Sequence, residues 1–191
     1  EALRAGMENL DRHVENLRTH YGVSPIVSIN RFDTDTDLEI RALLDHCGTL
    51  GVPVTLATHW AEGGAGATEL ATLVAAHCDA DPLPANQRHH AFVYEDELSL
   101  WQKIEAVTSK LYGASEVTAS TAIRKRLREL ADEGYGHLPV CIAKTPYSFS
   151  TDPQLRGAPR HHSVDIREVR LSVGAGFIVV VCGDIMTMPG L

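Results

Sequence analysis

Apolar residues recur at alternating three- and four-residue steps in several segments of the chain, a spacing typical of amphipathic helices. The first segment lies within residues 1–22, and its stripe consists of Leu3, Met7, Leu10, Val14 and Leu17. Thr36 and Glu39 have the spacing of a capping box, which predicts the start of a second helix that Gly51 closes. A third helix is predicted after the glycine-rich stretch 62–67, with one face formed by Leu70, Leu73, Val74 and His77.

Two apolar runs, residues 25–32 and 52–60, separate these helices and have the length of β-strands. The order is therefore helix, strand, helix, strand, helix, which favours a parallel sheet with helices packed against it. We predict an α/β fold in which residues 23–80 form a parallel βαβ-type unit. Residues 1–22 are predicted to be a helix that leads in from a preceding domain.

Residues 79–90 contain two prolines and few apolar side chains, so we predict a linker at 81–90. A short strand at 91–94 and two helices are expected to follow. The first helix carries Leu98, Trp101, Ile104, Val107 and Leu111, and the second carries Ile123, Leu127 and Leu130. Three strands are predicted at 138–143, 164–173 and 177–182, and the alternation within 164–173 is typical of an antiparallel strand. Residues 91–191 are therefore expected to form an α+β unit.

The net charge of −8 argues against a general nucleic-acid binder, because a basic surface supplies most of the affinity of such proteins. The segment 156–170 is locally basic, which favours an anionic small ligand or is only a solvated face. No apolar run reaches the roughly 18 residues of a membrane span, so no membrane partner is expected. The chain starts at Glu1 without a signal-type segment, and we expect a piece of a longer, cytoplasmic protein.

The cysteines are expected to be buried free thiols of a reducing compartment, because none forms a Cys-x-x-Cys pair. They are Cys47, Cys78, Cys141 and Cys182. The histidines occur as adjacent pairs at 89–90 and 161–162, and neighbouring side chains diverge on a helix or strand. We therefore expect surface histidines and assign no metal site.

Phe32 and Trp60 each close a predicted strand, and one predicted helix separates them. Ligands of open parallel sheets bind beyond the carboxyl ends of the strands. Two aromatic rings at neighbouring strand ends could hold a flat ring between them. The alternative for each residue is core packing. The polar and glycine-rich sequence after Trp60 favours exposure of the indole. The glycine run itself lacks the Lys-Ser/Thr of a P-loop, and a turn that needs positive φ and close packing explains it better than a phosphate site.

Lys144 begins a long polar segment, residues 144–159, after a predicted buried strand. A loop of about 20 residues in a compact domain is uncommon unless it is functional or disordered, and its aromatic residues argue against disorder. Two roles stay open for Lys144: it binds a carboxylate or phosphate, or it pairs with a nearby acid.

Six segments together resemble the formate–tetrahydrofolate ligase family, also called 10-formyltetrahydrofolate synthetase. They are NRFDTDT at 30–36, HWAEGGAG at 59–66, GYGHLPVC at 134–141, KTPYSFS at 144–150, LRGAP at 155–159 and GDIMTMPGL at 183–191. The resemblance covers essentially the whole chain, which corresponds to the carboxyl-terminal portion of such an enzyme.

The resemblance implies an ATP-dependent reaction that joins formate to tetrahydrofolate through formyl phosphate. It implies that Phe32 and Trp60 sandwich the pterin ring and that Leu56 lines the site near the nucleotide. Lys144 and the arginines within 156–170 are our further candidates for polar or anionic contacts. The resemblance places the phosphate-binding loop and the site of ATP with Mg²⁺ mostly in a missing amino-terminal domain, so no residue of this chain is assigned a catalytic role. A monovalent cation and a homo-oligomer of the full-length enzyme are further expectations.

Two positions depart from the family pattern. Asp33 stands where proline is often found, and Pro146 stands where the family usually has glutamine. The first is expected to alter the rim of the aromatic slot, and the second to alter what the loop contacts. The alternative function is a non-catalytic folate- or nucleotide-binding module, or a module that supports oligomerisation.

Overall fold

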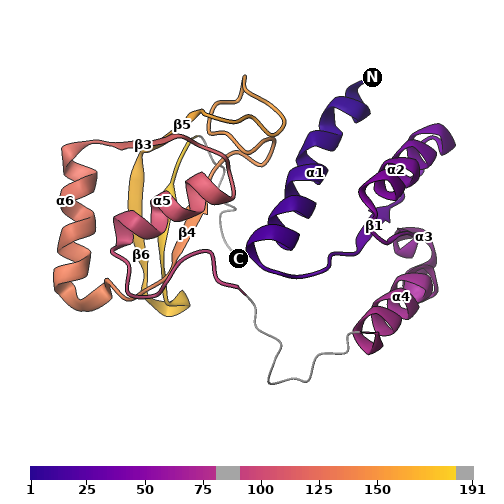
Figure 1. The fold of residues 1–191 in the computed structure, drawn as a ribbon, viewed down its shortest axis with the longest axis horizontal. Coiled ribbons are helices and arrows are strands. Elements are labelled where there is room, and N and C mark those ends of the chain that lie inside the picture. The colour runs from indigo at the N-terminus through magenta and orange to yellow at the C-terminus, as the bar shows by residue number, and fades with distance from the viewer. Residues whose placement is uncertain (81–90, 184–191) are drawn as a thin grey trace. The chain divides into compact units, whose positions relative to one another are not determined.

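Helices alternate with short strands along the described chain, and the predicted α/β class is confirmed (Figure 1). The structure is a computed structural model that describes residues 1–80 and 91–183. The chain forms two compact units. Unit 1 combines Glu1–Asn16 with the described residues from Phe92 onward, and unit 2 extends from Leu17 to Ala91. The predicted linker at 81–90 lies outside the described residues, and the predicted domain boundaries at 1–22, 23–80 and 91–191 stay predictions.

Unit 2 is built around one βαβ unit. The helix α1 (Ala2–His20) belongs to unit 1 as far as Asn16, and its last residues lead into unit 2. The elements of unit 2 are β1 (Val27–Asn30), α2 (Asp37–Leu50), β2 (Val54–Ala57), α3 (His59–Glu62), the 3₁₀ helix η1 (Gly63–Ala67) and α4 (Thr68–Asp79). Strands β1 and β2 pair in parallel, with Ile29 opposite Leu56 and Asn30 opposite Ala57. Because the strands are parallel, their carboxyl ends lie at the same edge of the sheet.

The ends of α2 follow from local side-chain chemistry. The predicted capping box is present: Thr36 accepts from the Glu39 N–H, and the Glu39 side chain accepts from the Thr36 N–H. Gly51 ends the helix with φ 58°, a left-handed conformation that glycine adopts at little cost. Ile40 and Cys47 are buried, while the other apolar side chains of this helix, Leu43, Leu44 and Leu50 among them, are partly or largely exposed.

Unit 1 contains two small sheets and two covering helices. Its elements after residue 91 are α5 (Leu100–Lys110), β3 (Glu116–Ala119), α6 (Thr121–Leu130), the π-type turn η3 (Ala131–Tyr135), β4 (Val140–Ala143), β5 (Ser163–Ile166), β6 (Glu168–Ser172), the 3₁₀ turn η4 (Val173–Ala175) and β7 (Phe177–Val181). One sheet has the order β4-β7-β6, with β4 parallel and β6 antiparallel to β7. The other pairs β3 with β5 in parallel.

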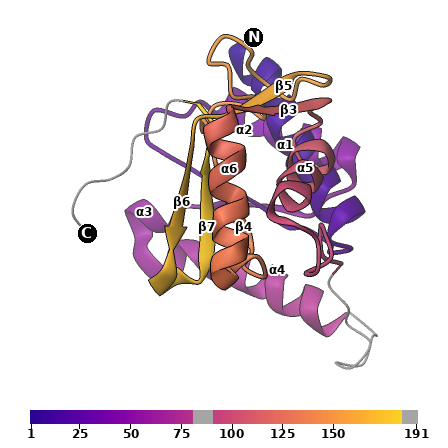
Figure 2. The same cartoon turned by 90° about the vertical axis from the view of Figure 1, so that its left-hand side faces the viewer.

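The core of unit 1 lies between these sheets and the helices α5 and α6, which stand beside each other in Figure 2. Its fully buried members come from both helices and both sheets: Ile104, Leu130, Val164, Ile178, Val180 and, directly after β7, Cys182. A lysine lies among them. Lys103 is 0% exposed, and its ammonium donates to the carbonyls of residues 136–138, each at 3.2 Å. The chain entering β4 is thus fixed by a charged group from α5.

Two strand predictions were wrong. Residues 91–94 form no strand, because their backbone groups bond elsewhere: the Ala91 N–H donates to the Tyr21 carbonyl (3.3 Å), and the Val93 carbonyl accepts from the Lys110 ammonium (2.6 Å). The predicted antiparallel strand 164–173 is two strands. β5 pairs in parallel with β3, and the Arg167 N–H then donates to the Val181 carbonyl (2.9 Å), which transfers the chain to β7.

The predicted burial of two cysteines and the predicted exposure of one histidine were also wrong. Cys47 and Cys182 are buried free thiols, but Cys78 and Cys141 are exposed, because each lies on the outer face of its helix or strand. His162 is only 8% exposed, whereas its neighbour His161 points outward with φ 61°. The remaining pair, residues 89–90, lies outside the described residues.

Candidate functional site

The carboxyl end of β1 runs into a tight turn that fixes the backbone of Phe32. The Phe32 N–H donates to the Asp35 carboxylate (2.8 Å), and the Phe32 carbonyl accepts from the Asp35 N–H (3.0 Å). These bonds close a four-residue β-turn of which Phe32 is the first residue. Its side chain is 53% exposed, so the turn holds the ring at the surface.

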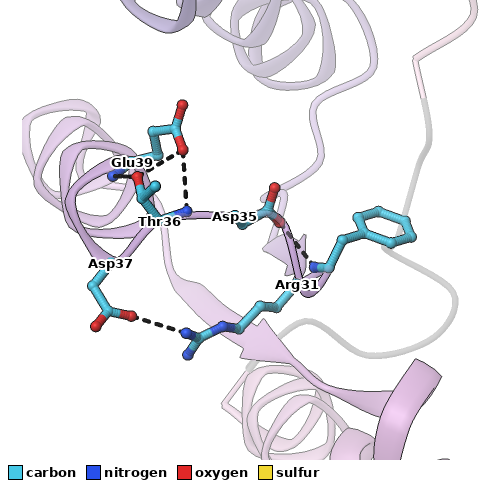
Figure 3. Close-up of polar contacts among 6 residues, drawn as sticks. Arg31, Asp35, Thr36, Asp37 and Glu39 are labelled. Atoms are coloured by element: carbon cyan, nitrogen blue, oxygen red, sulfur yellow. Dashed lines mark hydrogen bonds and ion pairs between the residues drawn. The ribbon is translucent and has the colours of Figure 1, made fainter.

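Polar contacts on both sides of this turn fix the chain where it enters α2 (Figure 3). The Arg31 guanidinium pairs with Asp37 at 2.9 Å. The Thr36 hydroxyl and N–H donate to the Glu39 carboxylate at 2.7 and 3.1 Å, and these bonds lower the pKa of Glu39. The backbone that carries Phe32 is therefore braced by β1 on one side and by α2 on the other.

Trp60 lies on the short helix α3, directly beyond the carboxyl end of β2. Thr58 begins this helix: its carbonyl accepts from the N–H groups of Ala61 and Glu62, each at 3.0 Å. Its own N–H donates to the Gly66 carbonyl (3.0 Å), which folds the glycine-rich stretch back onto the start of α3. The indole is 77% exposed.

The glycine-rich stretch is a packed turn, as the sequence predicts. Gly63 has φ 58° and ψ −139°, a region that is essentially restricted to glycine. A Cβ on Gly66 would lie only 2.6 Å from the His59 nitrogen and 2.7 Å from the Thr58 oxygen. The glycines therefore serve backbone geometry: Gly63 turns the chain, and Gly66 permits its close approach to Thr58.

Phe32 and Trp60 thus leave neighbouring strand ends as exposed aromatic side chains. Neither takes part in the ring contacts found among residues 1–80 and 91–183. Core packing accounts for neither side chain, because both are more than half exposed. Leu56 is half-buried in β2, on the same strand that leads to Trp60. The structure therefore brings Phe32, Leu56 and Trp60 to one small sheet.

Lys144 belongs to unit 1, where it follows β4. Its ammonium donates to the carbonyls of Thr145 and Ser148 and lies 5.2 Å from the Tyr112 ring centroid and 5.4 Å from that of Phe149. No acid pairs with it in the part of the chain that the structure describes. Burial lowers the pKa of Lys144. The sequence left two roles open for Lys144, and the described residues do not show the second of them, an ion pair with a nearby acid.

Buried serines order the loop after Lys144. The Ser150 hydroxyl donates to the carbonyls of Asp152 (2.9 Å) and Leu155 (2.7 Å), and Ser148 forms an isolated β-bridge with Gly157. Phe149 is 4% exposed and packs against the ring of His13 at 4.7 Å between centroids. The loop is therefore a packed structure, and its Ser-Phe-Ser run supplies the hydroxyls and the ring that close it.

Comparison with known proteins identifies the family. The sequence profile of the formate–tetrahydrofolate ligase family matches residues 1–191. The chain belongs to this family. It is 55% identical over 191 residues to the formate–tetrahydrofolate ligase of Sinorhizobium medicae strain WSM419. It is 53% identical over 190 residues to that of Methylococcus capsulatus, and 51% identical over 191 residues to that of Pelagibacter ubique.

Each of these comparisons covers 100% of this chain but only 33% of the relative. The chain thus spans about a third of the length of the curated ligases it matches. Among the residues described here, no group of three or more His, Cys, Asp or Glu side chains could hold a metal ion. A search of the same residues finds no helix that is both long and apolar enough to cross a membrane.

Asp33, where the resemblance predicts a proline, occupies the second position of the Phe32 turn. Proline is favoured there because its ring presets φ near −65°. We expect Asp33→Pro to raise the free energy of unfolding by about 0.5 kcal/mol, mainly by restricting the unfolded chain. Urea unfolding checks this. Thr34→Pro is the matched control at the third position, where proline disfavours a type I turn, and it should lower stability.

The buried His162 should make the stability of unit 1 depend on pH. Neither of its buried ring nitrogens has a hydrogen-bond partner within residues 1–80 and 91–183. Burial lowers the pKa of His162 from its ordinary 6.5, the charges of Lys144 and Arg12 add to this, and the nearby carbonyls of Phe149 and Pro159 oppose it. The unfolded chain therefore takes up the proton first as the pH falls. The free energy of unfolding of unit 1 therefore has its full value above pH 6.5 and decreases as the pH falls below it. For one titrating group the slope is under about 1.4 kcal/mol per pH unit.

Urea unfolding between about pH 8 and pH 5 measures this slope. His162→Leu should reduce it, because the titrating group is gone. His161→Asn, a change at the exposed neighbour that also tolerates positive φ, should retain the slope of the parent chain. An equal slope in the parent and in His162→Leu would contradict the assignment.

Proposed function

We propose that this chain is the folate-binding part of an ATP-dependent ligase that makes 10-formyltetrahydrofolate from formate and tetrahydrofolate through formyl phosphate. The observation that carries the proposal is the pair of exposed aromatic side chains, Phe32 and Trp60, at neighbouring carboxyl ends of a parallel sheet in a chain of this family. The pyrimidine half of the tetrahydropterin ring system is flat, as a group stacked between two such rings must be.

Stacking explains why these positions carry rings. A flat heterocycle gains about 1 kcal/mol per aromatic contact beyond the area it buries. The backbone at Phe32 and at Trp60 is already fixed by hydrogen bonds. Less conformational entropy of the protein is therefore lost when the ligand binds. Leu56 supplies apolar surface on the same small sheet, towards the nucleotide side of the proposed site.

Catalysis is proposed to occur in the part of the ligase outside this chain. ATP with Mg²⁺ would supply the phosphoryl group that activates formate. A monovalent cation and a homo-oligomer belong to the same proposal for the whole protein. Lys144 is proposed as a polar contact only if ligand binding releases it from the carbonyls of its own loop.

The test is a titration of tetrahydrofolate followed by tryptophan emission. Trp101→Phe leaves Trp60 as the single emitter, and binding should quench it. Trp60→Ala and Phe32→Ala, followed by calorimetry, should each weaken binding about tenfold. Phe92→Ala is the matched control, because Phe92 is also an exposed aromatic residue (85%) but follows no strand. It should bind like the parent chain.

Two outcomes would redirect the proposal. Unchanged affinity in Trp60→Ala would rule out the clamp. Absence of binding by every form would favour the alternative, a module that supports assembly of the ligase. The same substitutions in a full-length ligase separate the two readings, because a clamp residue raises the KM for tetrahydrofolate while an assembly residue changes the oligomeric state.

A further inference from the structure

Unit 1 has an apolar groove between α5 and α6, the two helices seen beside each other in Figure 2. Its volume is about 200 Å³. The buried side chains of Leu100 and Leu127 form its floor, and Trp101 and Ala131 form its sides. Ser99, Arg124 and Arg128 complete the lining. The groove belongs to unit 1, whereas the strand ends that carry the proposed folate clamp belong to unit 2.

The indole and one guanidinium of the groove are held in place. The Trp101 Nε1–H donates to the Glu105 carboxylate at 2.7 Å. The Arg124 guanidinium lies over the indole, 3.8 Å from the ring centroid. Stacking covers one face of a guanidinium and leaves the N–H groups at its edge able to donate. Arg124 is therefore positioned to bind an anion beside the groove.

The basic residues of α6 fall into two classes. Lys125 pairs with Glu129 (3.4 Å), and Arg126 pairs with Glu129 (3.5 Å) and Glu133 (3.0 Å). Arg124 and Arg128, the two that line the groove, have no carboxylate partner among residues 1–80 and 91–183. The positive charge that the helix leaves uncompensated is thus located at the apolar groove.

The volume of the groove limits what can fill it. Small-molecule sites have volumes of about 300–1,000 Å³, whereas an apolar cavity of about 150 Å³ holds one benzene molecule. A groove of about 200 Å³ therefore accommodates a single aliphatic or aromatic side chain. Arg124 and Arg128 are four residues apart on a helix, so they lie about 6 Å apart along its axis. Two carboxylates that flank one apolar side chain match this arrangement.

We propose that the α5–α6 groove docks an acidic protein segment, which inserts one apolar side chain between the helices and places carboxylates on Arg124 and Arg128. Charge complementarity selects this partner, because both unpaired groups at the groove are cationic and its floor is apolar. A nucleic acid is a poorer match, since the groove has no row of cations that could follow a phosphate backbone and the chain carries a net charge of −8.

The experiment is calorimetry of the 191-residue chain with three blocked pentapeptides. The acidic peptide acetyl-Glu-Glu-Leu-Glu-Glu-amide should bind. Replacement of its leucine by alanine should weaken binding about tenfold, because the apolar anchor is lost. The charge-reversed peptide acetyl-Lys-Lys-Leu-Lys-Lys-amide should not bind.

Two double variants of α6 locate the binding. The double variant Arg124→Gln with Arg128→Gln should bind the acidic peptide about tenfold more weakly, which corresponds to somewhat under 1 kcal/mol for each lost ion pair. Lys125→Gln with Arg126→Gln removes the same charge from the same helix but outside the groove, and it should retain most of the affinity. Equal losses in the two variants, equal binding of the basic peptide, or no binding of the acidic peptide at millimolar concentration would each overturn the proposal.

Discussion

Substitution of Gly66 by alanine is expected to lower the free energy of unfolding by about 2 kcal/mol and to abolish folate binding. The new Cβ would lie 2.6 Å from the His59 nitrogen and 2.7 Å from the Thr58 oxygen. Both are backbone atoms, so they cannot rotate away as a flexible side chain can. The hydrogen bond from the Thr58 N–H to the Gly66 carbonyl must lengthen or break, and Thr58 is the residue that begins the helix of Trp60.

Gly64→Ala is the matched control within the same glycine run. A Cβ at Gly64 meets nothing within 4 Å, and its φ lies outside the left-handed region. It should therefore be tolerated and even slightly stabilising, because alanine restricts the unfolded chain. Urea unfolding and tetrahydrofolate titration of both variants check the prediction. Similar behaviour of the two variants would show that the close approach of Gly66 does not hold α3 in place.

Substitution of Lys103 by methionine is expected to destabilise unit 1 by about 3 kcal/mol. Methionine retains most of the apolar stem and removes the ammonium, so three carbonyls at residues 136–138 lose their shared donor. Burial lowers the pKa of Lys103, while the charges of Asp96 and Glu97 oppose this. Loss of a buried charge can itself be favourable. Here the carbonyls decide the sign, because three part-buried acceptors lose one charged donor together, and hydrogen bonds to a charged group contribute about 1.5–3 kcal/mol.

The control is Lys125→Met, which removes an exposed lysine that pairs with Glu129 at the helix surface. It should change stability by less than about 1 kcal/mol. Urea unfolding of both variants, followed by circular dichroism, measures the difference. If Lys103→Met were as stable as Lys125→Met, water would have to replace the ammonium at the carbonyls.

Local signals in the sequence were sufficient for much of the fold. The capping box at Thr36 and Glu39, the terminating Gly51 and the two apolar runs of unit 2 predict the βαβ unit that is observed. The exposure of Trp60 also followed from its polar and glycine-rich surroundings. These features depend on interactions between residues a few positions apart, which a sequence displays directly.

Features that depend on distant partners were missed. The step from Ile166 to Val169 breaks the two-residue period and marks the transfer from β3 to β7, but a period alone does not identify the strand that each half pairs with. β3 itself was not predicted, since Glu116–Ala119 is short and half polar. Lys103 stands on the apolar stripe of α5, a signal that could have indicated its burial. Its acceptors lie more than 30 residues further along the chain.

Each of the two units carries one exposed thiol to which a dye can be attached. Cys47 and Cys182 are buried, and burial raises the pKa of the Cys182 thiol to about 12, so neither should react with a mild alkylating reagent. The exposed Cys78 lies in unit 2 and the exposed Cys141 in unit 1. A donor dye and an acceptor dye attached at these two positions, without any engineered residue, would report the distance between the units in solution and how tetrahydrofolate changes it.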